Sequence, residues 1–241
     1  MEYSATTFGE RFAADYDTRN ERTDTEACVD VLEQLARGGP ALELAIGTGR
    51  IGLPLSQRGL RVDGVEASPE MVEQLRKKPG GADIDVVIGD MAEVPVEGEY
   101  ALIYLIFNTL SNLTTQDAQV RCFMNAARHL RDDGLFVLEA GVPDLRSLRE
   151  GQYVDAEAVD LDEVVLDVCR YDAVTQLMHK NHVAFRPGDV RLRPVLLRFT
   201  WPSEMDLMAR LAGLRVIERW GDWYGTAFDE RSTSNIVVYG R

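Results

Sequence analysis

A glycine-rich turn in residues 41–55, ALELAIGTGRIGLPL, constrains the fold more than any other stretch of the chain. Gly47, Gly49 and Gly52 follow one apolar run and precede another, in the spacing GxGxxG. Glycines there permit a tight strand-to-helix turn and let a ligand approach the backbone N–H groups at a helix N-terminus. A turn that binds nothing is the plainer alternative. The surrounding strand and helix favour an α/β fold with a nucleotide-type site.

The pattern around this turn predicts a parallel sheet. Over the first 149 residues, short apolar runs alternate with longer amphipathic ones, as in repeated strand–helix–strand units. The best-marked helix begins after Thr114 or Thr115, either of which can cap it, and should end at Gly134. Strands are expected near residues 41–46, 60–67, 84–90, 100–107 and 135–141, and helices near 50–59, 68–78 and 114–134.

The chain changes character near residue 151. From there to about residue 200, β-branched and apolar runs between turn-like segments favour antiparallel strands. Ser203 can then cap a short helix, and two closing strands follow. We therefore expect an α/β fold with a doubly wound, Rossmann-like, mostly parallel seven-stranded sheet and an antiparallel β insertion after its fifth strand. Edge strands of the insertion could pair two copies, so a monomer and a homodimer both stay open.

Composition narrows the classes of partner. Lys and Arg number 26 against 40 Asp and Glu, and the resulting net charge of −14 argues against binding to nucleic acid. Cys28, Cys122 and Cys169 lie far apart and match no metal-binding spacing, so no metal is expected. The N-terminal residues resemble no signal peptide, and no apolar run is long enough to span a bilayer. These features predict a cytoplasmic protein without a membrane partner.

Two acidic residues help to identify the ligand of the glycine turn. Glu66 lies 19 residues after Gly47, close to the ~20-residue spacing of an acid that binds ribose hydroxyls in dinucleotide sites. Glu43 lies four positions before Gly47, where an NAD-binding loop requires no acid. Residues 43–49, ELAIGTG, resemble motif I of the class I S-adenosylmethionine-dependent methyltransferases, an acid followed by GxGxG. Ala45 replaces the first glycine of that pattern, a change between two small residues.

Two further stretches resemble the same family in the expected order. Residues 62–75, VDGVEASPEMVEQL, resemble its second motif, which implies that Glu66 holds the ribose hydroxyls of the cofactor. Residues 87–95, VIGDMAEVP, resemble its third motif, which implies that Asp90 binds the adenine amino group and the Met91 N–H its ring. The resemblance therefore implies S-adenosylmethionine as cofactor and S-adenosylhomocysteine as product.

The resemblance continues into the fourth strand. Residues 100–113, YALIYLIFNTLSNL, look like that strand and the loop beneath the transferred methyl group. In all, it spans residues 35–141 and the last two strands. The cofactor-binding residues that it implies are Tyr16, Arg22, Glu43, Ala45, Gly47, Gly49, Glu66, Ala67, Asp90, Met91, Ile106 and Phe107.

An N-terminal helix usually closes over the cofactor in this family. Phe8, Phe12 and Tyr16 fall four residues apart on one face of such a helix, where they could pack in the core or reach the cofactor. In the second case Tyr16 contacts the methionine end, and Arg19 or Arg22 pairs with its carboxylate. The expected segments of a single domain are a helical lid (1–34), a cofactor-binding core (35–150), a β-rich insertion or cap (151–200) and a closing helix with strands (201–241).

The acceptor is expected to be a small molecule. Methyltransferases of base amino groups resemble one another in a (D/N)PP(Y/F) motif, whereas residues 106–109 here read IFNT. Base-carbon methyltransferases need a cysteine nucleophile, usually beside proline, and no Pro-Cys pair occurs. The order of elements resembles small-molecule N- and O-methyltransferases of sugar and natural-product pathways. An NAD(P)-dependent Rossmann oxidoreductase and a non-catalytic S-adenosylmethionine-binding protein remain as alternatives.

The catalytic residues are less well determined. Methyl transfer mainly requires alignment and exclusion of water, and a hydroxyl acceptor additionally requires a general base. Ligands bind at the carboxyl ends of strands in open α/β sheets, which favours Asn108 after the fourth strand and Glu139 at the end of the fifth. Tyr224, in the last loop, and His182, in the insertion, are further candidates.

Overall fold

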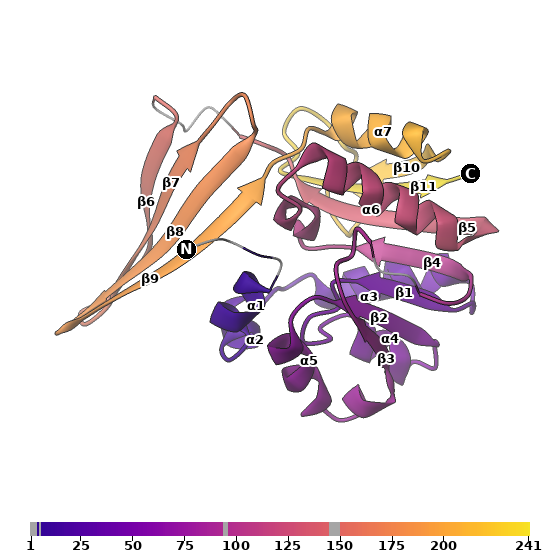
Figure 1. Cartoon of the computed structure of the whole chain (residues 1–241), viewed down its shortest axis with the longest axis horizontal. Coiled ribbons are helices and arrows are strands. Elements are labelled where there is room, and N and C mark those ends of the chain that lie inside the picture. The colour runs from indigo at the N-terminus through magenta and orange to yellow at the C-terminus, as the bar shows by residue number, and fades with distance from the viewer. Residues whose placement is uncertain (1–3, 5, 94–95, 145–149) are drawn as a thin grey trace.

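Two β-sheets organise the chain in the computed structural model, which describes Ser4 and residues 6–93, 96–144 and 150–241. Figure 1 shows the larger sheet within the core and the smaller one standing beside it. The strands of the larger sheet are β1 (Ala41–Leu44), β2 (Val62–Glu66), β3 (Asp85–Ile88), β4 (Tyr100–Leu105), β5 (Leu130–Gly141), β10 (Arg215–Trp220) and β11 (Ser234–Gly240).

The larger sheet has the strand order β10-β11-β5-β4-β1-β2-β3. Neighbouring strands among β1 to β5 are parallel, whereas β11 runs antiparallel between β5 and β10. The strand order reverses between β1 and β4, so a crevice forms at the carboxyl ends of these two strands. The doubly wound, mostly parallel seven-stranded sheet expected from the sequence is confirmed.

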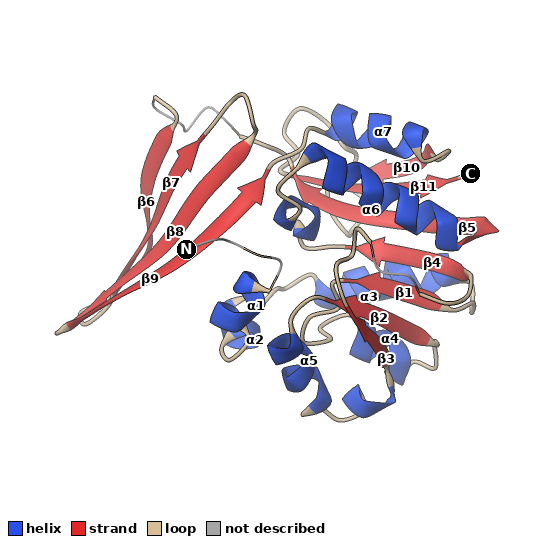
Figure 2. Cartoon of the chain, in the orientation of Figure 1, coloured by secondary structure: helices blue, strands red, loops and turns tan. Residues whose placement is uncertain are grey.

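Helices cover both faces of this sheet (Figure 2). The helices are α1 (Thr7–Phe12), α2 (Tyr16–Arg19), α3 (Thr25–Ala36), α4 (Gly52–Gln57), α5 (Pro69–Arg76), α6 (Gln116–His129) and α7 (Pro202–Leu211), with short 3-10 turns η1 (Gly81–Asp83) and η2 (Thr109–Asn112). Alternate side chains of a strand point to opposite faces of the sheet. In β4, Ile103 and Leu105 therefore pack in the cluster with α6 and α7, whereas Leu102 and Tyr104 pack in the cluster with α3 and α4.

The best-marked helix starts as expected and ends earlier. Thr115 caps α6, since its Oγ1 accepts a hydrogen bond from the Ala118 N–H at 3.2 Å. The helix stops at His129 and the chain enters β5 directly, so the expected end at Gly134 is wrong. A Cβ at Gly134 would lie 2.9 Å from the Tyr100 carbonyl oxygen. This glycine therefore permits a close backbone approach between β5 and β4.

The expected cap of the last helix is also wrong. The N-cap position of α7 is Trp201, and no side chain there accepts a capping hydrogen bond. Pro202 occupies the first helical position, where its fixed φ suits the helix and its missing N–H has no partner to lose. Pro202 therefore begins α7, and Ser203, the expected cap, is the second residue of the helix.

The smaller sheet is the antiparallel insertion expected after the fifth strand. Its strands pair in the order β6-β7-β8-β9, and all three pairings are antiparallel. The strands of this sheet are β6 (Gln152–Val159), β7 (Val164–Tyr171), β8 (Leu177–Arg186) and β9 (Asp189–Arg198).

Among the described helices, none is long and apolar enough to cross a membrane.

Candidate functional site

A cavity of about 600 Å³ opens where the carboxyl ends of β1, β2 and β4 meet the N-terminal helices and the smaller sheet. Most of the residues that the sequence assigned to a cofactor line it. Glu43 and Ile106 instead border an adjoining void of about 30 Å³, and Gly49 lines neither of these two spaces. The assigned residues that line the large cavity are Tyr16, Arg22, Ala45, Gly47, Glu66, Ala67, Asp90, Met91 and Phe107.

The glycine loop after β1 has a left-handed backbone at three positions. The φ angles are +56° at Ala45, +56° at Gly47 and +80° at Gly49. A Cβ at Gly49 would lie 2.3 Å from Cδ1 of Leu75, so glycine is required there for packing against α5. A Cβ at Gly47 would meet nothing nearer than 3.9 Å, so this residue leaves space on the cavity side. Ala45 adopts the same backbone with a side chain, at a cost of about 1 kcal/mol.

Glu66 connects the end of β2 to this loop. Its Oε2 accepts a hydrogen bond from the Gly47 N–H at 2.8 Å, and its Oε1 accepts one from the Ser68 N–H at 2.9 Å. The side chain lines the cavity although it is 8% exposed, and burial raises the pKa of its carboxyl. An oxygen-rich acceptor group is therefore held rigidly at the cavity floor, where it can bind hydroxyl groups of a ligand.

Glu43 lies behind the loop. The Tyr104 hydroxyl donates a hydrogen bond to its Oε2 at 3.1 Å, and the residue is buried between β1 and α4. Burial raises the pKa of this carboxyl to about 8. Glu43, the acid of the first motif, thus supports the glycine loop from within the protein and does not line the large cavity.

The buried position of Glu43 predicts a pH-dependent contribution to stability. The folded protein holds its proton more tightly than the unfolded chain, so the free energy of unfolding falls as the pH rises from the ordinary pKa of 4.5 to about 8. Glu43→Gln keeps an acceptor for Tyr104 and does not titrate. We expect the melting temperature of this variant, relative to wild type, to rise by several degrees across that interval in thermal unfolding scans.

The matched control for this experiment is Glu73→Gln, because the Glu73 side chain is 67% exposed. Its melting temperature should follow that of the wild type at each pH. A constant difference between Glu43→Gln and wild type across the interval would contradict the assignment.

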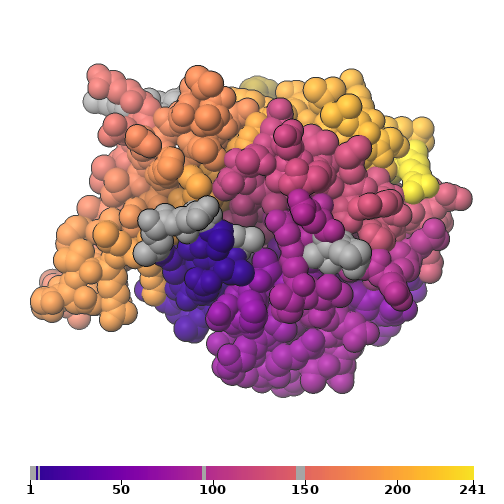
Figure 3. All heavy atoms as spheres, viewed as in Figure 1, coloured from indigo at the N-terminus to yellow at the C-terminus, as the bar shows by residue number. Residues whose placement is uncertain are grey.

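The N-terminal segment is attached to the cavity on two sides. Asp17 accepts a hydrogen bond from the Thr48 hydroxyl at 2.7 Å and pairs with Lys78 at 2.6 Å, which fixes α2 to the glycine loop. Asp15 pairs with Arg193 of β9 at 2.7 Å. In Figure 3 this segment (indigo) lies between the insertion (orange) and the core (purple). It consists of the two short helices α1 and α2 where one helix was expected.

The aromatic residues of this segment both pack in a core and reach the cavity, the two possibilities that the sequence left open. Phe8 and Phe12 stack with ring centroids 4.6 Å apart, and Phe12 packs against Met71 and Val195. Phe8, Phe12 and Tyr16 also line the cavity. The segment therefore shares a small core with α5 and β9 and forms one wall of the cavity.

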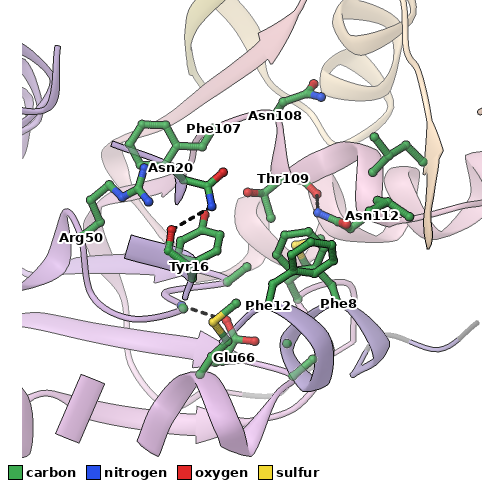
Figure 4. A pocket seen from close by; sticks show the side chains of 18 of the residues that line it. Phe8, Phe12, Tyr16, Asn20, Arg50, Glu66, Phe107, Asn108, Thr109 and Asn112 are labelled. Atoms are coloured by element: carbon green, nitrogen blue, oxygen red, sulfur yellow. Dashed lines mark hydrogen bonds between the residues drawn. The ribbon is translucent and has the colours of Figure 1, made fainter. Parts of the chain in front are cut away.

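Arg22 and Arg50 are the arginines beside Tyr16 and Phe107. Arg22 lines the cavity, but its Nε donates to Asp24 and its Nη2 donates to Glu139 at 2.9 Å. The guanidinium of Arg50 lies 5.0 Å from the Tyr16 ring and 5.1 Å from the Phe107 ring (Figure 4). Its buried Nη2 has no hydrogen-bond partner among the described residues.

Sequence reasoning missed Arg50. Its position directly after Gly49 was the available signal, because a residue there lies in the turn between the glycine loop and the helix that follows it. Arg19, the other arginine considered, lines the cavity and pairs with Asp15 at 2.6 Å. Of these cations, Arg50 is the one with a buried nitrogen left to bind an anionic group.

The loop after β4 is strained and held by Glu139. Phe107 and Asn108 both have left-handed backbones, with φ of +57° and +59°. Glu139 accepts hydrogen bonds from the Phe107 N–H at 3.0 Å and from Arg22 at 2.9 Å. It is 3% exposed and does not line the described cavity. Glu139 therefore holds the loop after β4 and Arg22 in place through these hydrogen bonds.

The other catalytic candidates occupy different positions. Asn108 lines the cavity, and its Oδ1 accepts hydrogen bonds at 3.0 Å from the Gly141 N–H and from the Ser111 hydroxyl. Tyr224 is 70% exposed and is not among the residues that line the cavity. The sequence could not show this, because the direction of a loop side chain depends on tertiary packing.

The smaller sheet supplies a polar wall, which we define as Glu157, Lys180, His182 and Arg193. His182 Nδ1 lies 2.9 Å from Glu157 Oε2, and Lys180 pairs with Asp167 at 2.8 Å. Only His182 of this wall was singled out from the sequence. In the part of the chain that the structure describes, no cluster of His, Cys, Asp and Glu could hold a metal ion.

Comparisons with known proteins agree with this geometry. Residues 41–134 match a family described as a methyltransferase domain. Cypemycin N-terminal methyltransferase from Streptomyces sp is 28% identical over 211 residues, which make up 85% of this chain and 84% of that protein. The structure of the CcbJ methyltransferase from Streptomyces caelestis is similar with a TM-score of 0.92 and 33% identity, over 99% of both chains.

A more distant structure shares the fold and carries the cofactor. CalS10 from Micromonospora echinaspora, described as an amino pentose methyltransferase bound to SAM, gives a TM-score of 0.68 at 20% identity over 95% of both chains. Together with the ordered motifs around the cavity, these similarities set aside the dinucleotide-dependent and non-catalytic alternatives. The chain belongs to the class I S-adenosylmethionine-dependent methyltransferases and uses S-adenosylmethionine as its cofactor.

Proposed function

We propose that the protein methylates an amino nitrogen of a small polar molecule. The observation that carries this proposal is the chemistry of the loop after β4, which the family resemblance puts beneath the methyl group. Its cavity-lining residues are Phe107, Asn108, Thr109 and Asn112, none of which accepts a proton near neutral pH. An amine requires only a neutral lone pair, whereas a hydroxyl usually requires a base. The relative that acts on the N-terminus of cypemycin supports the same choice.

The described residues fit the cofactor. Bound here, S-adenosylmethionine supplies an already activated methyl group. Glu66 faces the cavity as a rigid acceptor for ribose hydroxyls, and Asp90 with Met91 lines the part assigned to adenine. Arg50 would bind the carboxylate through its unpartnered Nη2, and Tyr16 would pack beside it. In this proposal Arg50 takes the role that the family resemblance suggested for Arg19 or Arg22.

The N-terminal segment and the polar wall would serve the acceptor. The ion pairs of Asp15 and Asp17 hold the segment over the cavity, where it excludes water from the reacting groups. The polar wall presents charged and hydrogen-bonding groups opposite the glycine loop. A molecule with several polar groups, such as an aminated sugar or a natural-product intermediate, matches such a surface.

A specific observation supports transfer to oxygen as a second candidate. His182 lines the cavity with its Nδ1 beside Glu157, an arrangement that orients an imidazole as a general base. The same pair also links β6 to β8 across the intervening strand β7, as a purely structural contact of the sheet can. The two candidates therefore differ in whether His182 takes a proton.

Turnover on paired acceptors distinguishes the candidates. Small amines and their hydroxyl analogues would be incubated with labelled S-adenosylmethionine and the purified protein, and the methylated atom identified by NMR. We expect methylation of amines, with kcat of His182→Gln within about threefold of wild type. A loss of roughly 100-fold or more in this variant, with hydroxyl acceptors preferred, would instead support transfer to oxygen. His129→Gln, on the last residue of α6, is the control.

A further inference from the structure

Gln119 lies between the loop after β4 and the insertion sheet, and its side chain is completely buried. It is near the start of α6 and is 0% exposed. A glutamine amide carries two N–H donors and an oxygen that accepts two hydrogen bonds, and such groups are paired when they are buried. The described partners of this side chain all lie outside its own helix, in the loop and at the end of the insertion sheet.

The amide nitrogen of Gln119 holds the far end of the loop after β4. Its Nε2 donates hydrogen bonds to the carbonyl oxygens of Leu110 at 3.3 Å and Leu113 at 3.1 Å. Leu113 lines the cavity. The near end of the same loop is held by Glu139, which accepts a hydrogen bond from the Phe107 N–H. Gln119 and Glu139 thus fix the loop at both of its ends.

The amide oxygen of Gln119 holds the end of the insertion sheet. Its Oε1 accepts hydrogen bonds from the Arg198 guanidinium and from the Thr200 hydroxyl, the second at 2.8 Å. Arg198 is the last residue of β9, the strand that carries Arg193 of the polar wall, and Figure 1 shows α6 beginning beside the end of β9. Arg198 is 4% exposed and also pairs with Glu204 of α7 at 2.7 Å. The end of β9 is therefore tied to the core.

A single buried amide thus connects the loop after β4 with strand β9, and both line the cavity. Methyl transfer depends mainly on alignment, and a misplacement of about 1 Å costs roughly 100-fold in rate. We propose that Gln119 is a positioning residue that fixes the loop and β9 relative to each other and thereby determines how the acceptor fits between them. This inference rests on the proposed function, which assigns the acceptor to the loop and the polar wall.

Gln119→Leu tests this role, because it removes both connections with a side chain of similar size. The substrate is the amine or hydroxyl acceptor with the highest turnover in the paired experiment above, at saturating S-adenosylmethionine. We expect the KM for this acceptor to rise roughly 10-fold or more. The dissociation constant of S-adenosylhomocysteine, measured by calorimetry, should stay within about twofold of wild type, because Gln119 contacts neither the glycine loop nor Glu66.

Gln119→Glu separates the two connections. Beside the Arg198 guanidinium its carboxylate still accepts hydrogen bonds, but it donates none to the loop carbonyls. Hydrogen exchange followed by mass spectrometry should show faster exchange of the amides of residues 109–113 in both variants. Exchange of residues 195–198 should rise only in Gln119→Leu. Thermal unfolding scans verify that both variants are folded.

Gln116→Leu is the matched control. It makes the same substitution one turn earlier on α6, where the exposed Gln116 amide donates a hydrogen bond to Glu204. Its acceptor KM and its exchange at residues 109–113 should equal those of the wild type.

Three results would overturn the role of Gln119. These are an unchanged acceptor KM in Gln119→Leu, unchanged exchange of residues 109–113, and a KM and a dissociation constant of S-adenosylhomocysteine that rise together, as a general loss of structure would cause. A preference for hydroxyl acceptors would instead overturn the proposed function and leave this test intact.

Discussion

Replacing Glu66 by Gln should weaken binding of S-adenosylhomocysteine roughly 100-fold or more, because hydrogen bonds to a charged acceptor contribute about 1.5–3 kcal/mol each. In the proposed site the carboxylate binds two ribose hydroxyls while also accepting hydrogen bonds from the Gly47 and Ser68 N–H groups. The amide of Gln turns an N–H₂ group toward one of these donors. Calorimetric titration of both proteins measures the change.

Glu73→Gln provides the control for this prediction. It makes the same substitution seven positions along the chain, on a side chain that is 67% exposed and pairs with Lys77. Its affinity should equal that of the wild type within error. Equal affinity of Glu66→Gln and wild type would show that the ribose lies elsewhere, and that Glu66 serves only to hold the glycine loop.

Replacing Gly49 by Ala should destabilise the protein by about 3 kcal/mol. The left-handed backbone at φ +80° costs an alanine about 1 kcal/mol. The new Cβ would also lie 2.3 Å from Cδ1 of Leu75 and 3.0 Å from Cγ of Leu53, and such overpacking costs roughly 1–3 kcal/mol. Urea unfolding followed by circular dichroism gives the free energy of unfolding.

Gly59→Ala separates backbone strain from overpacking. Gly59 has φ of +90°, and a Cβ there would meet no atom within 4 Å, so the variant carries only the backbone cost of about 1 kcal/mol. The difference between the two variants then measures the contact with Leu75 and Leu53. If both variants lost the same stability, the packing of the loop against α5 would not be as tight as the structure shows.

The parts of the site that the sequence predicted are those whose residues lie close together along the chain. Gly47 and Glu66 are 19 residues apart, and their direct hydrogen bond follows from two adjacent parallel strands. Strand positions were predictable for the same reason, since hydrophobic periodicity is a local property. The helix end predicted at Gly134 was wrong because a glycine after a helix also suits a close contact between strands.

The parts that the sequence could not give depend on distant contacts. Glu139 accepts a hydrogen bond from Arg22, which lies 117 residues away along the chain, and no local pattern indicates this contact. The unpartnered Nη2 of Arg50 is apparent only in the folded chain, because its burial and its lack of a partner depend on tertiary packing. The polar wall likewise depends on how the insertion folds back over the core, which no local pattern specifies.

The insertion sheet shares no strand with the sheet that carries the cofactor motifs. Lys180 and His182 can therefore be substituted without direct contact with the glycine loop or Glu66, whereas Arg193 also holds the N-terminal segment through Asp15. If the polar wall binds the acceptor as proposed, natural drift and laboratory evolution can both change acceptor preference in the insertion sheet while the larger sheet keeps the cofactor site. Exchanging residues 152–198 between relatives is accordingly the most economical route to a methyltransferase with a new acceptor.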